Sequence, residues 1–234
     1  MRVSAFRALR PSLARLRGDA SGVALIEFAF ALPILLAVGF GGLETANLAI
    51  ANLRVSHAAI DLADNTARMG RQSTSTGFQV LSESDINDAI QAMRLEMSDL
   101  TTNGRVTISS VEARTDSNGN VTQFLHWQRC VGLQPGTGYD STYGSAPIDD
   151  SGTTVTGIGS PQLTAPAGSG LMFVEISYNY KSLFGAIPLL GTMLAGTKRL
   201  HYVSAMVVRQ ARSTYDTIDN SAQVTRMTCD KHTV

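Results

Sequence analysis

An apolar run near the N-terminus constrains this sequence more than any other feature. Residues 23–43 form a stretch of 21 residues in which Glu27 is the only charged side chain. An α-helix rises about 1.5 Å per residue, so roughly 20 residues cross a hydrocarbon core of about 30 Å. The run therefore predicts a single transmembrane helix.

The charges on the two sides of this run predict its orientation. Before it, the only acid is Asp19, and after it the next cation is Arg54. Because positive charge is enriched on the cytoplasmic side of membrane helices, we expect a single membrane pass with the N-terminus in the cytoplasm and the C-terminal part exported. That part has no concentration of lysine and arginine, so nucleic acid is not expected as a partner. The cations before the run are Arg2, Arg7, Arg10, Arg15 and Arg17.

A glycine at the start of the run suggests where the chain is processed. Gly22 lies between the basic leader and the apolar residues, and Glu27 follows it after four residues without an acid. A secretory signal would instead place its small residues after the apolar region, where Gly39-Phe-Gly-Gly42 could also serve. The order glycine, four residues, glutamate at the head of an apolar helix resembles that of type IV prepilins.

The run GVALIEFAFALPILLAVGFG resembles the opening of TadE-like proteins, including the pair Glu27-Phe28 and the step Leu32-Pro33. The resemblance implies a minor pilin or pseudopilin of the tight-adherence (Tad, Flp-type) pilus, a type IV pilus that serves adhesion and biofilm formation. It also implies that a prepilin peptidase cuts after Gly22, so that Val23 becomes the first residue. The implied partners are the inner membrane, other pilins of the Tad pilus, the prepilin peptidase and the inner-membrane assembly platform.

Glu27 and Pro33 are the assembly residues in this interpretation. A carboxylate inside a membrane helix costs about 2.5–3.5 kcal/mol on insertion scales and therefore usually has a partner. Cleavage would supply one in the ammonium of Val23, of the same or a neighbouring subunit, and such a pair fixes axial register. The alternative is a glutamate near the helix end that reaches the lipid headgroups. Pro33 removes one backbone hydrogen bond and predicts a kink, and by resemblance it permits local melting in a filament.

The sequence predicts four consecutive parts, of which the third is a periplasmic helical stalk that continues the membrane helix as far as Gly70. The stalk is expected to carry an apolar stripe that the head or another subunit covers, with His57 packed within it. The stripe consists of Leu43, Ala46, Ile50, Leu53, Ile60 and Ala67. The four parts are the basic leader 1–22, the transmembrane helix 23–43, the stalk 44–70 and the head 71–234.

The head is expected to be an α+β fold, pilin-like in outline, with the long helix packed on an antiparallel sheet. Ser84-Asp85 can cap a second helix that ends near Asn103-Gly104. A hairpin turn is expected at residues 116–120. Its oxygen-bearing side chains suggest calcium only weakly, because no downstream glutamate completes a calcium-binding loop. The expected strands are residues 105–113, 121–128, 171–180 and 199–209.

Two segments of the head have no regular pattern. Residues 132–170 are rich in glycine, serine, threonine and proline and are expected to form an exposed loop or flap. Residues 183–191 are apolar but too short and too broken by glycine and proline to span a membrane. They are expected to lie on the head, on the bilayer surface or against a partner, with a core-covering turn as the simplest alternative.

Cys130 and Cys229 are the two cysteines of the chain, and export to an oxidising compartment predicts a disulfide between them. Two free thiols are the alternative. The histidines are scattered and no Gly-x-Ser-x-Gly motif occurs, so we expect no catalysis, no metal site and no cofactor. The competing function is an uncleaved, signal-anchored periplasmic domain that binds a ligand or acts as a scaffold. A periplasmic hydrolase would need a nucleophile and base that the sequence does not offer.

Overall fold

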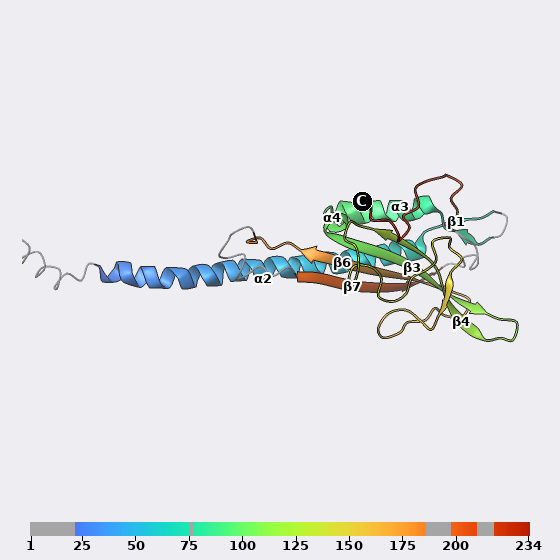
Figure 1. The fold of residues 1–234 in the computed structure, drawn as a ribbon, viewed down its shortest axis with the longest axis horizontal. Coiled ribbons are helices and arrows are strands. Elements are labelled where there is room, and N and C mark those ends of the chain that lie inside the picture. Colours follow the sequence, from blue (N-terminus) through green and yellow to red (C-terminus); the bar gives the residue numbers. More distant parts are fainter. Residues whose placement is uncertain (1–21, 75–76, 186–197, 210–217) are drawn as a thin grey trace, which may run out of the picture. The chain divides into compact units, whose positions relative to one another are not determined.

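The computed structural model describes residues 22–74, 77–185, 198–209 and 218–234. The leader residues 1–21 lie outside the described residues. The chain divides into two compact units, the first ending at Asn47 and the second beginning at Leu48. The architecture is α+β, as the sequence predicts, with a long N-terminal helix and a five-stranded antiparallel sheet (Figure 1).

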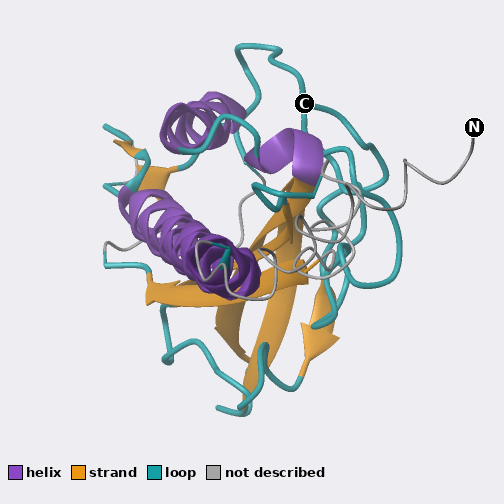
Figure 2. Ribbon diagram, turned by 90° about the vertical axis from the view of Figure 1, so that its left-hand side faces the viewer, coloured by secondary structure: helices purple, strands orange, loops and turns teal. Residues whose placement is uncertain are grey.

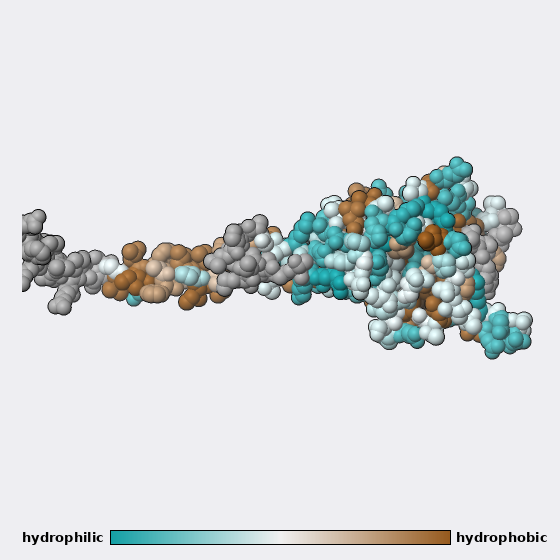
Figure 3. Space-filling model, in the orientation of Figure 1, coloured by the Kyte–Doolittle hydropathy of each residue, from teal (hydrophilic) through white to brown (hydrophobic). Residues whose placement is uncertain are grey.

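Helix α2, Val23–Arg68, is a continuous helix of 46 residues. It passes through Pro33 without interruption, and its surface in the first unit is largely apolar (Figure 3). Its last turn ends where the Met69 N–H donates to the Asn65 carbonyl at 3.0 Å. Gly70, the expected stop, follows with φ of +127°, a conformation that residues with a Cβ rarely adopt.

The sheet has the strand order β5-β4-β3-β6-β7, and every neighbouring pair is antiparallel. Each of the four expected strands is present, and β5 is an addition within the segment expected to be a loop. A two-stranded ribbon, β1 (Arg71–Gln72) with β2 (Gln79–Val80), follows α2. The sheet strands are β3 (Gly104–Thr115), β4 (Val121–Val131), β5 (Thr153–Val155), β6 (Gly170–Tyr180) and β7 (Lys198–Val207).

The second helix begins two residues earlier than the sequence suggested. Helix α3 is Glu83–Glu96, and its N-cap is Ser82 rather than Ser84. The Asp85 N–H donates to the Ser82 hydroxyl at 3.3 Å, and the Ser82 N–H donates to the Asp85 carboxylate at 2.9 Å. This reciprocal capping box needs residues three apart, which Ser84 and Asp85 are not. The helix also ends early, at Glu96 with Met97 as its C-cap, and Leu100–Asn103 forms a separate single turn, α4.

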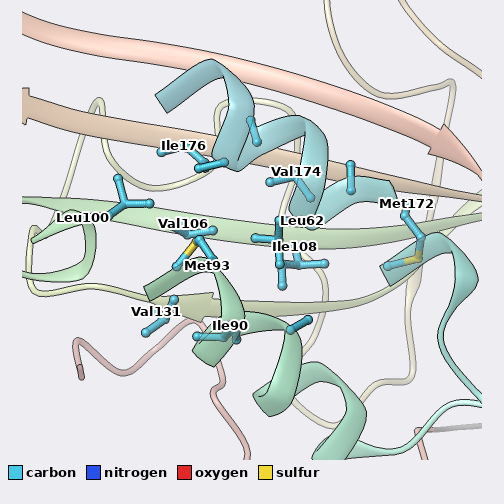
Figure 4. Packing of buried hydrophobic residues seen from close by; sticks show 14 of the residues in the cluster. Leu62, Ile90, Met93, Leu100, Val106, Ile108, Val131, Met172, Val174 and Ile176 are labelled. Atoms are coloured by element: carbon cyan, nitrogen blue, oxygen red, sulfur yellow. The ribbon is translucent and has the colours of Figure 1, made fainter. Parts of the chain in front are cut away.

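One hydrophobic core lies between the helices and one face of the sheet. Helices α2 and α3 lie on the same side of the sheet (Figure 2). Leu62 of α2 and Ile90 of α3 point toward Ile108 of β3 and Val174 of β6 (Figure 4). All of these side chains are buried. We call this cluster the helix-side core. It holds the second half of α2 on the sheet.

The head does not cover most of the apolar stripe expected on the stalk, which leaves another subunit as its expected cover. Ile50, Leu53 and Ile60 are 48%, 62% and 44% exposed, and His57 is exposed rather than packed. Alanine dominates the packed face because its small side chain lets the helix approach the sheet closely. The large aliphatic side chains of the stripe therefore do not mark the face of α2 that packs on the sheet. The packed residues are Val55, Ala58, Ala59, Leu62, Ala63 and Ala67, of which the stripe contained only Ala67.

A second core lies on the opposite face of the sheet. Leu171 and Phe173 of β6 belong to it, whereas Met172 and Val174, which alternate with them, belong to the helix-side core. In β4 a bulge at His126 lets Trp127 and Leu125 point to opposite faces, although they are two residues apart. We call this cluster the loop-side core.

Residues 132–170 differ from the exposed loop that the sequence suggested. Ile158 and Ala165 are buried in the loop-side core, and β5 pairs with β4 at the sheet edge. Tyr143 packs edge-on against Phe173 with ring centroids 5.4 Å apart. This segment is therefore a packed cover for one face of the sheet. Periodicity did not reveal it because its buried residues are separated by turns.

Candidate functional site

The chain at Gly22 is exposed and forms the start of α2. The Gly22 carbonyl accepts a hydrogen bond from the Ile26 N–H at 3.1 Å, the first bond of the helix. A Cβ added at Gly22 would meet no atom within 4 Å, and the backbone there does not have the positive φ that favours glycine. Within the described part of the chain, neither packing nor backbone conformation therefore requires a glycine at position 22.

Glu27 lies four residues after Val23, which places the two on the same face of the helix. Both side chains are exposed in the single chain. Pro33 is also exposed, and because proline has no N–H, it cannot donate to the carbonyl of residue 29 as other helical residues do. The helix thus presents a carboxylate and a weakened backbone on an otherwise apolar surface.

Among the described residues, α2 is the one helix long and apolar enough to cross a membrane, and the apolar window is not buried within the structure. Exposed apolar side chains on this scale need a non-aqueous environment. The region that contains Gly22, Glu27 and the apolar part of α2 also matches a known family model. Residues 22–64 match the model of the TadE-like protein family. The match confirms the resemblance inferred from the N-terminal motif. Residues 65–234 lie outside it.

The TadE-like match begins at Gly22 and runs through the apolar part of α2 into the part that packs on the sheet. It thus includes Val23, Glu27 and Pro33, the residues that the sequence singled out for processing and assembly. Neither the comparison with curated proteins nor the comparison with solved structures found a match.

In the head, Cys130 and Cys229 are joined in a disulfide with an S–S distance of 2.07 Å. Around it, the C-terminal tail runs beside β4, where the Cys130 N–H donates to the Met227 carbonyl at 2.7 Å. The buried Arg105 donates to the Cys229 carbonyl at 2.6 Å and to the Lys231 carbonyl at 3.1 Å. The tail is thus fixed by backbone, side-chain and covalent contacts together.

We predict that Cys130 and Cys229 are oxidised to a disulfide in the exported protein. Non-reducing peptide mapping of protein made in the periplasm should recover the peptides of Cys130 and Cys229 joined. In the chain-entropy model a bridge closing a loop of about 100 residues contributes roughly 4.7 kcal/mol, so the Cys130→Ser/Cys229→Ser variant should unfold at markedly lower urea. Quantitative alkylation of both thiols without reductant would contradict the bridge.

A buried cluster of ionic side chains was not foreseen from the sequence. Arg129 of β4 donates hydrogen bonds to the carboxylate of Glu83 and to that of Asp150. The distance from its Nη1 to Asp150 Oδ1 is 2.8 Å. All three side chains are at most 3% exposed. Arg226 of the tail also pairs with both acids and is partly exposed. The cluster joins α3, β4, the segment 132–170 and the tail.

The electrostatics of this cluster favour the charged state of Arg129. Burial alone would lower the pKa of the guanidinium, but the hydrogen bonds that it donates to Asp150 and Glu83 raise this pKa above its ordinary value. Because two cations face two carboxylates, the charges balance within the cluster. Arg129 escaped notice because the expected strand ended at residue 128. Its partners are 46 and 21 residues away, and no local pattern links them.

Two further polar groups lie on the sheet. The His126 Nδ1 is 2.9 Å from a Glu112 carboxylate oxygen, both side chains being buried. Glu175 accepts hydrogen bonds from the Ser141 hydroxyl and the Thr142 N–H. Burial raises the pKa of the Glu175 carboxyl, although these hydrogen bonds act in the opposite direction. Both arrangements join neighbouring elements of the head.

In the turn at residues 116–120, the carboxylate of Asp116 is hydrogen-bonded within the turn itself. The Asp116 carboxylate accepts from the backbone N–H groups of Asn118 and Asn120, each at 2.8 Å. Hydrogen bonds from Asn120 lower the pKa of Asp116. These bonds stabilise a tight turn, and the turn needs no cation to explain them. Among the described residues, no group of three histidine, cysteine, aspartate or glutamate side chains is placed to hold a metal ion.

Proposed function

We propose that this chain is a minor pilin or pseudopilin that takes part in assembling a Tad-type pilus. In this role it is cut after Gly22, is anchored in the inner membrane by residues 23–43 and carries its head in the periplasm. The observation that carries the proposal is the TadE-like match, which begins at Gly22 and coincides with an apolar helix surface that no other described residue buries. The five arginines before the helix support the orientation.

The freedom around Gly22 supports a role in processing. A glycine that neither packing nor backbone conformation requires is readily explained by a second molecule that reads it, such as a peptidase. Gly39 offers a comparison within the same helix, because a Cβ there would also meet no atom within 4 Å. The two glycines therefore differ in position relative to the apolar run and not in their structural demands.

Replacing Gly22 by leucine should block cleavage and leave nearly all of the protein at full length in the membrane. The matched variant Gly39→Leu should still lose residues 1–22. Intact-mass measurement of membrane-extracted protein reads both outcomes directly. If Gly22→Leu still yielded a chain beginning at Val23, the glycine would not govern processing.

The alternative is an uncleaved, signal-anchored periplasmic domain that binds a ligand or acts as a scaffold. It predicts full-length mass for the wild type as well as for both variants. Cleavage after the apolar run, as in an ordinary secretory signal, would release a soluble head and would respond to Gly39 instead. The same mass measurement thus separates the three cases.

A further inference from the structure

One end of the sheet carries exposed cations beside an exposed apolar side chain. Strand β6 ends at Tyr180, which pairs with Lys198 at the start of β7. Lys181, Lys198 and Arg199 are exposed, and Leu183 is 58% exposed. We call these four residues the basic end of the head.

The basic end lies where α2 enters the second unit. Tyr202, four residues after Lys198, donates its hydroxyl hydrogen to the Asn52 side chain at 2.9 Å. Later in the helix, Leu62 lies near Val174, well back along β6 from Tyr180 (Figure 4). Helix α2 therefore runs away from the basic end as its residue numbers increase. In Figure 1 the arrowhead of β6 and the start of β7 lie at one end of the sheet, and the C-terminal end of α2 lies toward the other end.

Few residues separate the apolar run from the second unit. Only residues 44–47 lie between the apolar run and the start of the second unit at Leu48. Even fully extended, the five steps from Leu43 to Leu48 cover no more than about 18 Å. The point where α2 enters the second unit therefore lies within about 18 Å of the end of the apolar run, and the basic end belongs to that side of the second unit.

From this placement we infer that the basic end of the head binds the surface of an anionic phospholipid bilayer. Lys181, Lys198 and Arg199 would pair with lipid phosphates, and Leu183 would enter the headgroup region. Between Lys181 and Lys198 the sequence contains no charged residue. Most of that stretch, residues 186–197, lies outside the described residues.

Nearby acids do not cancel these cations. Asp140 is 2.8 Å from the guanidinium of the buried Arg105, and Asp99, which accepts a hydrogen bond from the neutral Tyr178 hydroxyl at 2.7 Å, is one carboxylate against the three cations. Arg199 also lies over the Tyr139 ring, with 5.6 Å between Cζ and the ring centroid. The surface therefore keeps an excess of positive charge. Charge complementarity and continuity with the membrane-spanning residues favour a bilayer over a protein partner.

The test uses the full chain in vesicles and a single fluorescent label. The described residues contain no free cysteine, so Leu183→Cys provides one thiol for an environment-sensitive nitrobenzoxadiazole dye. Ser117→Cys is the matched control, because it is exposed in the turn after β3, at the far end of the sheet. In vesicles of mixed phosphatidylglycerol and phosphatidylcholine, quenchers on the acyl chains should quench the label at 183. At 117, iodide in the water should quench it instead.

Charge reversal then tests the chemistry. With the label at 183, Lys181→Glu and Lys198→Glu should each lower the ratio of bound to free head by about fivefold or more on the mixed vesicles. Pure phosphatidylcholine vesicles should show little effect. Equal iodide quenching at 183 and 117, or no response to either charge reversal, would overturn the inference. Since no arm depends on cleavage or on a pilus, the inference can fail while the proposed function stands, and the reverse is also true.

Discussion

Replacing Arg129 by methionine should lower the free energy of unfolding of the head by about 3–5 kcal/mol. The change removes the central cation of a buried cluster and leaves Glu83 and Asp150 facing each other with only the partly exposed Arg226 between them. Buried carboxylates without a counter-charge carry most of this cost. Domains are commonly stable by about 5–15 kcal/mol, so the variant should be marginal.

Urea unfolding followed by tryptophan fluorescence measures this effect at the site itself. Trp127 is the only tryptophan, is buried and lies 5.6 Å from the Arg129 guanidinium carbon. Arg226→Met touches the same acids from a partly exposed position and should cost clearly less. Adding Glu83→Gln and Asp150→Asn to the Arg129→Met variant should restore much of the loss. A single variant as stable as the wild type would show that the cluster contributes little.

Changing Glu27 to glutamine should abolish incorporation into pili while leaving insertion and cleavage intact. Glutamine keeps the size of the side chain and its hydrogen bonding, and a neutral side chain enters the membrane at least as easily. After cleavage, the ammonium of Val23 would lie at the positive end of the helix dipole without the carboxylate that shares its face. Burial of that charge among other pilins would cost several kcal/mol.

The measurement counts pili and assays surface attachment in the native host, with processing confirmed by mass. Asp61→Asn is the matched control, because it removes an exposed carboxylate from the same helix outside the apolar run. Normal piliation in the processed Glu27→Gln protein would contradict the assembly role. It would support the alternative that Glu27 is an acid that reaches the lipid headgroups.

Sequence patterns predicted the elements of this fold better than their contacts. The long helix and the antiparallel strands followed from hydrophobic periodicity, because each depends on the pattern of neighbouring residues. The face of the stalk that packs on the sheet did not follow. Periodicity gives weight to large side chains, whereas close packing on a sheet selected alanines such as Ala58 and Ala63.

The residues of the candidate site also differed in whether the sequence could reveal them. Gly22 and Glu27 stand out because their meaning depends on their order along the chain, and the TadE-like match covers both. The cluster around Arg129 depends on side chains brought together from four separate elements. No spacing rule links such residues. The pairing of Cys130 with Cys229 was predictable only because the chain has two cysteines.

The two cores on opposite faces of one sheet make the head modular. Substitutions in the loop-side core, at Ile158 or Phe173 for example, change residues that do not belong to the cluster holding α2. The turn at 116–120 and the outer part of the segment 132–170 can therefore diverge, or accept a grafted epitope, with little effect on the helix. A lineage of such proteins can vary what it displays outward while keeping one unchanged anchor.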